Sequence, residues 1–180
     1  MRFVDEYRAP EQVMQLVEHL RLRARLLPHT AKRPLRIMEV CGGHTHAIFK
    51  FGLDQLLPEN IEFIHGPGCP VCVLPMGRID ACIDIASRPG VIFCTFGDAM
   101  RVPGKNGSLL QAKSRGADVR IVYSPMDALK LAQQHPDREV VFFGLGFETT
   151  MPATALTLRQ ARERGVGNFY FFCQHITLLP

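Results

Sequence analysis

Short apolar runs alternate along the chain with longer stretches in which apolar residues recur at helical spacing. The apolar runs are nearly continuous and lack strict alternation, as expected of parallel strands that are buried on both faces. Glycine and proline close most of the intervening stretches, where helices commonly end. The expected strands are residues 35–41, 61–65, 91–96, 119–123, 140–144 and 169–173, and the expected helices are residues 10–27, 46–57, 75–87, 108–115, 124–134 and 152–164.

This alternation predicts the doubly wound α/β class, in which Rossmann-like β-α units build a parallel sheet. We expect an N-terminal helix in residues 1–30, a complete α/β domain in residues 31–117 and an incomplete α/β domain in residues 118–180. Three β-α units precede residue 117, but no linker marks this boundary, and the two halves could share one sheet. No helix follows the last expected strand, so we expect the chain to be the N-terminal part of a longer protein.

The composition of the 180 residues, 47% hydrophobic and 21% charged, is that of a globular chain with a real core. Because the sequence has neither a long apolar run nor a secretory leader, we expect a cytoplasmic protein without a membrane partner. The net charge of +4 is spread along the sequence, which argues against a nucleic-acid partner. In a reducing compartment, six cysteines favour metal or redox chemistry over structural disulfides.

The first motif, Cys41-Gly42-Gly43-His44-Thr45-His46, ends the first expected strand and precedes a helix. Ligands of open α/β sheets bind beyond the carboxyl ends of strands, and glycines allow a close approach to the backbone. Helix N–H groups and the nearby imidazoles would stabilise the Cys41 thiolate, the form that binds soft metals. A phosphate-binding glycine turn is the alternative, but His44 and His46 favour metal or proton handling.

The second motif is the pair Cys69 and Cys72, which follows the second strand and precedes a helix. Such a C-x-x-C pair can chelate a metal or close a disulfide, and a nearby helix start lowers thiol pKa values. The sequence has no second C-x-x-C, which disfavours a closed zinc site. We expect the remaining cysteines, Cys82, Cys94 and Cys173, to be core residues.

The third motif, Gly144-Leu-Gly-Phe-Glu-Thr-Thr150, follows the fifth expected strand. Thr149 and Thr150 are natural N-caps for the next helix, and Glu148 is predicted either to cap helix N–H groups or to transfer protons. The motif fails as a dinucleotide fingerprint because Thr149 replaces the third glycine.

Together, residues 41–47, 66–72 and 146–150 resemble the signatures of the HypD family of [NiFe]-hydrogenase maturation scaffolds. The resemblance implies a factor that, with HypC, holds iron while two cyanides and one carbon monoxide are installed. Cyanide would come from the HypE and HypF pair, and the finished unit would pass to the hydrogenase large subunit. The family also has two α/β domains around a cleft and a C-terminal [4Fe-4S] region, whose cysteines are absent here.

By this resemblance, Cys41 is the main iron-binding thiol, and Cys69 with Cys72 are the paired thiols needed for cofactor assembly. We expect His44 and Glu148 to handle protons, and the cofactor site to include Gly42, Gly43, His44 and Thr149. The chain would then be mainly an assembly scaffold with thiol redox activity in addition.

Two alternatives stay open at this stage. A thioredoxin-like thiol-disulfide oxidoreductase would use Cys69 and Cys72 but leave Cys41 without a role. A nucleotide-binding α/β enzyme would explain the glycine turns, although both nucleotide fingerprints fail.

Overall fold

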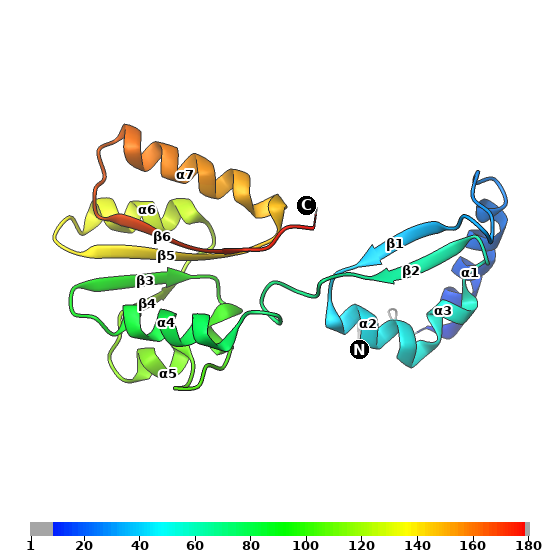
Figure 1. The fold of residues 1–180 in the computed structure, drawn as a ribbon, viewed down its shortest axis with the longest axis horizontal. Helices are drawn as coiled ribbons and strands as arrows, with labels where there is room; N and C mark the ends of the chain where they lie inside the picture. Colours follow the sequence, from blue (N-terminus) through cyan, green and yellow to red (C-terminus); the bar gives the residue numbers. More distant parts are fainter. Residues whose placement is uncertain (1–8, 179–180) are drawn as a thin grey trace. The chain divides into compact units, whose positions relative to one another are not determined.

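The computed structural model describes residues 9–178, drawn in Figure 1. The chain divides into two compact units, of which unit 1 ends at Gly68 and unit 2 begins at Cys69. Unit 1 runs from blue to cyan in Figure 1, and unit 2 runs from green to red. None of the helices within residues 9–178 is long and apolar enough to cross a membrane.

Unit 2 is built on four parallel strands in the order β4-β3-β5-β6. In this order, the chain adds β4 on one side of β3 and then β5 and β6 on the other side, as in doubly wound folds. The strands are β3 (Val91–Thr95), β4 (Val119–Ile121), β5 (Glu139–Gly146) and β6 (Phe169–His175).

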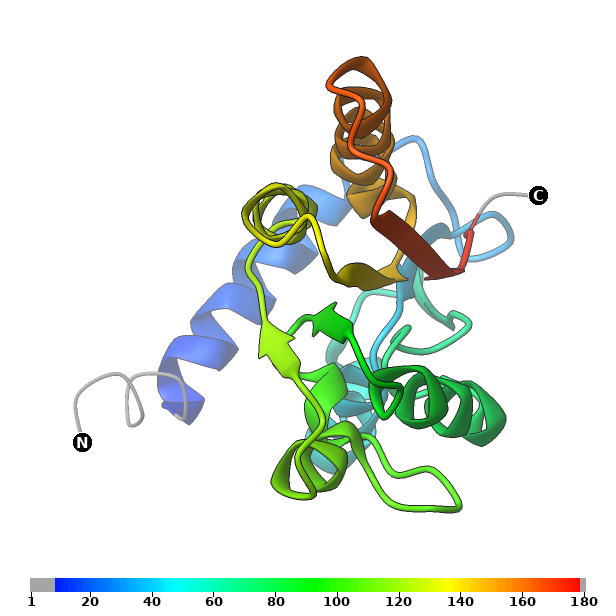
Figure 2. The ribbon, with the colours of Figure 1, turned by 90° about the vertical axis from the view of Figure 1, so that its left-hand side faces the viewer.

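Helices cover both faces of this sheet, as Figures 1 and 2 show. One face carries α4 (Met76–Ala86) and α5 (Leu109–Ser114), and the other carries α6 (Pro125–Gln134) and α7 (Met151–Glu163). All five residues of β3 are buried, and alternate residues enter opposite cores: Phe93 packs in the α4–α5 core and Ile92 in the α6 core. Burial on both faces explains the continuous apolar run.

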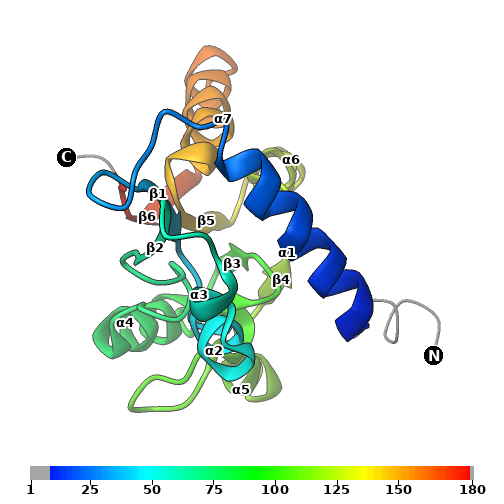
Figure 3. The same ribbon diagram turned by 90° about the vertical axis from the view of Figure 1, so that its right-hand side faces the viewer.

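Unit 1 contains one pair of parallel strands, β1 (Leu35–Glu39) and β2 (Ile61–His65), in a register that places Glu39 opposite His65. Its helices are α1 (Pro10–Ala24), α2 (Gly42–Phe51) and α3 (Leu53–Leu56). Figure 3, in which unit 1 faces the viewer, shows α1 as a separate long helix and α2 with α3 after β1. The parallel sheets and the N-terminal helix confirm the predicted α/β class.

An asparagine plays the same part in each unit, immediately before a strand. The Asn60 Nδ2 donates to the Ala24 carbonyl at the end of α1 (2.8 Å), and its own carbonyl accepts from the Leu35 N–H (2.8 Å). In unit 2, the Asn168 Nδ2 donates to carbonyl oxygens at and after the end of α6, and its carbonyl accepts from the Val140 N–H in β5 (2.8 Å). These bonds satisfy carbonyls that a helix end leaves unpaired.

The predicted division at residue 117 is not where the chain divides. The strand that follows this boundary, β4, pairs with β3, which precedes it, so both lie in the one sheet of unit 2. The helix α1 is not a unit of its own either, because Asn60, just before β2, bonds to the end of α1 within unit 1. Residues 1–8 lie outside the described part of the chain.

The helix predicted at residues 46–57 begins earlier and is interrupted. It starts at Gly42, so the glycines and histidines of the first motif form its first turns. It ends at Gly52, whose φ of 59° is left-handed, and α3 starts at the next residue. Glycine is the residue type that adopts this conformation at little cost.

Candidate functional site

Cys41 occupies the junction between the carboxyl end of β1 and the first turn of α2. It is the N-cap residue of α2 and has an extended backbone. Its carbonyl accepts hydrogen bonds from the N–H groups of His44 (2.8 Å) and Thr45 (3.0 Å), and its thiol is half-buried. Cys41 therefore lies at a positively polarised helix end, an environment that favours anionic ligands.

The two glycines that follow Cys41 differ in their surroundings. A Cβ atom built on Gly43 would lie 3.6 Å from the Cys41 Sγ, whereas one built on Gly42 would have no neighbour within 4 Å. A side chain at residue 43 would therefore contact the thiol directly. Because Gly42 and Gly43 have no side chains, a ligand can approach the Cys41 thiol from the side of the first helical turn.

The carboxylate of Glu39, the last residue of β1, joins three parts of this region. Its Oε2 accepts the backbone N–H of Cys41 (2.9 Å), and its Oε1 accepts from the Thr45 hydroxyl and lies 2.7 Å from the His65 Nδ1. The hydrogen bonds from Thr45, His65 and the Cys41 amide lower the pKa of Glu39 to about 2. From the sequence, Glu39 was not singled out and His65 was given no role, although each ends a strand shortly before a motif cysteine.

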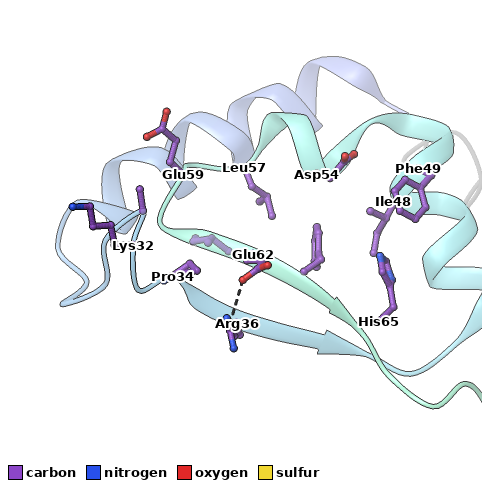
Figure 4. A pocket seen from close by; sticks show the side chains of 13 residues that line it. Lys32, Pro34, Arg36, Ile48, Phe49, Asp54, Leu57, Glu59, Glu62 and His65 are labelled. Atoms are coloured by element: carbon purple, nitrogen blue, oxygen red, sulfur yellow. Dashed lines mark hydrogen bonds and ion pairs between the residues drawn. The ribbon is translucent and has the colours of Figure 1, made fainter.

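The Nδ1 of His65 bonds to Glu39, and the rest of the imidazole faces a cavity. The cavity, of about 570 Å³, lies between the β1–β2 pair and the helices that follow β1. In Figure 4 the imidazole points toward Phe49 and Ile48, and the ring centroids of Phe49 and His65 are 5.2 Å apart. The ion pair of Arg36 with Glu62 (3.2 Å) lies along the same strands.

Gly66, the residue directly after β2, lies too close to β1 for a side chain to fit. Its N–H donates to the Glu39 carbonyl (2.8 Å), and a Cβ atom at Gly66 would lie 2.8 Å from the same oxygen and 3.0 Å from Met38. Only glycine permits this close approach of two backbones. Gly66 thus keeps β2 against the residue that contacts Cys41.

His44 and His46 do not gather around the thiol as a pair. Both are exposed residues of α2. Side chains two positions apart on a helix do not share a face. In the described hydrogen bonds, His44 reaches Cys41 through its backbone N–H and not through its imidazole.

Cys69 and Cys72 lie at the start of unit 2, in a turn that precedes α4. The turn containing them is closed by the Val73 N–H, which donates to the Cys69 carbonyl (3.0 Å), and α4 begins only at Met76. Cys69 is half-buried, Cys72 is exposed, and neither is in a disulfide. The predicted helix does follow this pair, with Pro75 as the N-cap residue of α4, and residues 73–74 separate Cys72 from that helix start.

Glu148 lies beyond the carboxyl end of β5, beside the point where the strand order of unit 2 reverses. Its carboxylate accepts the backbone N–H of Leu178, which follows β6. Thr149 belongs to the same short 3-10 helix, Glu148–Thr150. Thr150 is the N-cap residue of α7, as predicted, but its hydroxyl donates to the Phe147 carbonyl (2.8 Å) and makes no capping hydrogen bond.

The three isolated cysteines separate into two kinds. Cys82 and Cys94 are fully buried, as predicted, and burial raises the pKa of each thiol to about 12. Cys173 is exposed, and its Sγ lies 3.6 Å from the His175 Nδ1. The core prediction for Cys173 is wrong because β6 is the last strand of its sheet and part of it stays uncovered.

Residues 9–178 contain no group of three or more His, Cys, Asp or Glu side chains that could hold a metal ion. A [4Fe-4S] cluster takes four thiolates in most proteins. The described residues do not fit such a cluster, and none of them is assigned to it.

Comparison with known proteins identifies the relatives of the chain. The family described as "HypD: Hydrogenase formation hypA family" matches residues 11–180. The chain is 85% identical to the hydrogenase maturation factor HypD of Escherichia coli (strain K12) over 180 residues, which are all of this chain and 48% of that protein.

Two further relatives carry the same name. HypD of Rhodobacter capsulatus is 61% identical over 99% of this chain and 47% of its own length, and HypD of Rhizobium leguminosarum bv. viciae is 55% identical over 98% and 45%. The chain thus spans about half the length of the curated relatives it matches. A match over nearly every described residue, at this level of identity, shows that the chain belongs to the HypD family.

Proposed function

We propose that this chain carries the thiol site of a scaffold on which iron receives two cyanides and one carbon monoxide for [NiFe] hydrogenases. The observation that supports it best is the setting of Cys41: a half-buried thiol at a strand end and helix start, with two glycines beside it. The relatives named as hydrogenase maturation factors support the biological process.

The chemistry of Cys41 suits this cargo. Iron that carries cyanide and carbon monoxide is a soft centre that prefers thiolate ligands. A single thiol with open surroundings leaves positions on the iron for the incoming diatomic groups and for a thiolate supplied by HypC. Because a ligating thiol must lose its proton, a helix N-terminus is a favourable place for it.

In this proposal the remaining site residues assist the iron-binding thiol. Cys69 and Cys72 alternate between dithiol and disulfide and provide electrons or transient ligation. His44 and Glu148 handle protons, and Thr149 adjoins Glu148 at the end of β5. HypE, supplied by HypF, is the source of cyanide, and the hydrogenase large subunit receives the product.

The experiment that tests the proposal measures iron and infrared absorption after anaerobic expression. The full-length protein is produced with and without HypC, as wild type, as Cys41→Ala and as Cys173→Ala. Cys173→Ala is the matched control. It also removes a thiol that is not buried, but Cys173 lies in β6 of unit 2, away from the β1–α2 junction in the sequence.

We expect cyanide and carbonyl stretching bands that need HypC, vanish in Cys41→Ala and persist in Cys173→Ala. Equal bands in all three proteins would contradict the role of Cys41. Dithiol–disulfide exchange that depends on Cys69 and Cys72, without iron in the wild type, would instead support the oxidoreductase alternative.

A further inference from the structure

The proposed function gives no role to Glu39, although its carboxylate contacts Cys41, Thr45 and His65. Its side chain is only 9% exposed. Its two oxygens take hydrogen bonds from three separate segments: the β1–α2 junction at Cys41, α2 at Thr45 and the end of β2 at His65. Carboxylates in the ionised form only accept hydrogen bonds, so all three partners act as donors.

The contacts with Cys41 and Thr45 fix the thiol-bearing residue. Oε2 holds the Cys41 amide, and Oε1 holds the Thr45 hydroxyl one helical turn later. The Cys41 carbonyl accepts the Thr45 N–H as well. Hydrogen bonds therefore hold both the N–H and the carbonyl of Cys41, and the thiol takes no part in them.

The contact with His65 selects one form of the imidazole. Because Glu39 accepts, the hydrogen of a neutral His65 is on Nδ1, which leaves the lone pair on Nε2. Among the described residues, no hydrogen bond to this second nitrogen is found. The His65 side chain is 41% exposed and lines the cavity of about 570 Å³, so the nitrogen is accessible to a ligand.

We propose that Glu39 is a positioning residue of the thiol site, which fixes the Cys41 backbone and orients His65 with its Nδ1–H on the carboxylate and its Nε2 lone pair toward the cavity. Groups just outside a metal's own ligands commonly fix those ligands in this way. The effect of Glu39 on iron, through Cys41, rests on the proposed function. The orientation of His65 does not, and it can be tested without iron.

The variant Glu39→Gln isolates this role because it keeps the size of the side chain. A glutamine has one acceptor oxygen and an amide group that donates, so it cannot accept from Cys41, Thr45 and His65 together. Glu62→Gln is the matched control, because Glu62 is a β2 carboxylate that contacts only the exposed Arg36 side chain in its described hydrogen bonds. Glu39→Asp tests rescue by charge at a shorter reach.

The first measurement is the tautomer of His65, read from long-range proton–nitrogen correlations in the full-length protein labelled at histidine nitrogen. The His65→Gln variant assigns the signal. At pH ~8, where free histidine is neutral, we expect the Nδ1–H form in the wild type and in Glu62→Gln. Loss of that form is expected in Glu39→Gln. An Nε2–H form in the wild type overturns the inference, even if Glu39→Gln does not fold.

The second measurement is the dissociation constant for Fe²⁺ under anaerobic conditions, with circular dichroism to verify folding. Loss of an outer carboxylate raises such constants about 10–100-fold, so we expect this change in Glu39→Gln, a smaller one in Glu39→Asp and none in Glu62→Gln. A wild-type affinity in folded Glu39→Gln overturns the inference. If Cys41→Ala binds iron as the wild type does, the proposed function fails, and the tautomer alone decides the role of Glu39.

Discussion

Replacement of Gly66 by alanine is expected to disturb the candidate site without touching any of its polar side chains. The new Cβ atom would lie 2.8 Å from the Glu39 carbonyl oxygen and 3.0 Å from the Met38 side chain. The Met38 side chain, which is half exposed, can move away. The carbonyl belongs to β1 and accepts the Gly66 N–H at 2.8 Å, so relief of the contact requires the two strand ends to separate.

The cost of this change follows from two effects. Insertion of a methyl group where no space exists costs about 1–3 kcal/mol. Weakening of the hydrogen bond between Gly66 and Glu39 adds about 0.5–1.5 kcal/mol. We therefore expect the carboxyl end of the β1–β2 pair to be less stable by about 2–4 kcal/mol, a large change for one methyl group.

Hydrogen–deuterium exchange resolved by peptide is the suitable assay, because it reports the opening of a single segment. A loss of about 2–4 kcal/mol corresponds to exchange that is about 30-fold to 1000-fold faster. The acceleration should be confined to peptides covering residues 35–45 and 61–66, and peptides of β3 should be unchanged.

Gly77→Ala is the matched control, since a Cβ atom there would meet nothing within 4 Å. This substitution lies inside α4, where alanine favours the helix by up to about 1 kcal/mol. Exchange in Gly66→Ala within about threefold of the wild type, below 1 kcal/mol, would refute the claim that this approach excludes a side chain.

Three further predictions concern hydrogen bonding, acid stability and thiol reactivity. Asn168→Ala removes an amide that donates to three carbonyls at 2.8–3.0 Å, and it should lower the free energy of unfolding by about 2–3 kcal/mol in urea titrations. The pKa of Glu39 falls from 4.5 to about 2 on folding, so its contribution is complete above pH 4.5 and is lost as the pH falls toward 2. Exchange at the Cys41 amide, corrected for intrinsic rates, should therefore accelerate in that window more than exchange in β3. Iodoacetamide at pH ~8 should alkylate the exposed Cys173 at least about 100-fold faster than Cys82 or Cys94, whose pKa values near 12 suppress the thiolate, and peptide mass spectrometry measures the ratio.

The sequence predicted the order and type of the secondary structure well, because buried parallel strands leave a distinct apolar signature. The five residues of β3 are all buried, and the run at 91–96 already indicated this. The sequence could not show which strands share a sheet. Pairing of β3 with β4 across residue 117 depends on contacts between residues that are distant in the sequence.

The sequence predicted the cysteine of the candidate site but not its carboxylate. Cys41 was recognised from its glycines and histidines, and it does lie between the end of a strand and the start of a helix. Glu39 resembled any polar residue at a strand end, and only the register of β1 with β2 places it opposite His65. Cys173 was misjudged because an apolar run does not reveal where the cover of an edge strand stops.

The division of the chain between Gly68 and Cys69 falls inside the motif that contains the paired cysteines. Four peptide steps join His65 to Cys69, and a chain of that length spans at most about 14 Å. This upper limit on the distance between His65 and Cys69 applies at any orientation of the two units. A thiol so close along the chain has an effective concentration of at least about millimolar for groups at the end of β2. Encounters between the Cys69 thiol and groups at the end of β2 are therefore intramolecular, and dilution of the protein does not slow them.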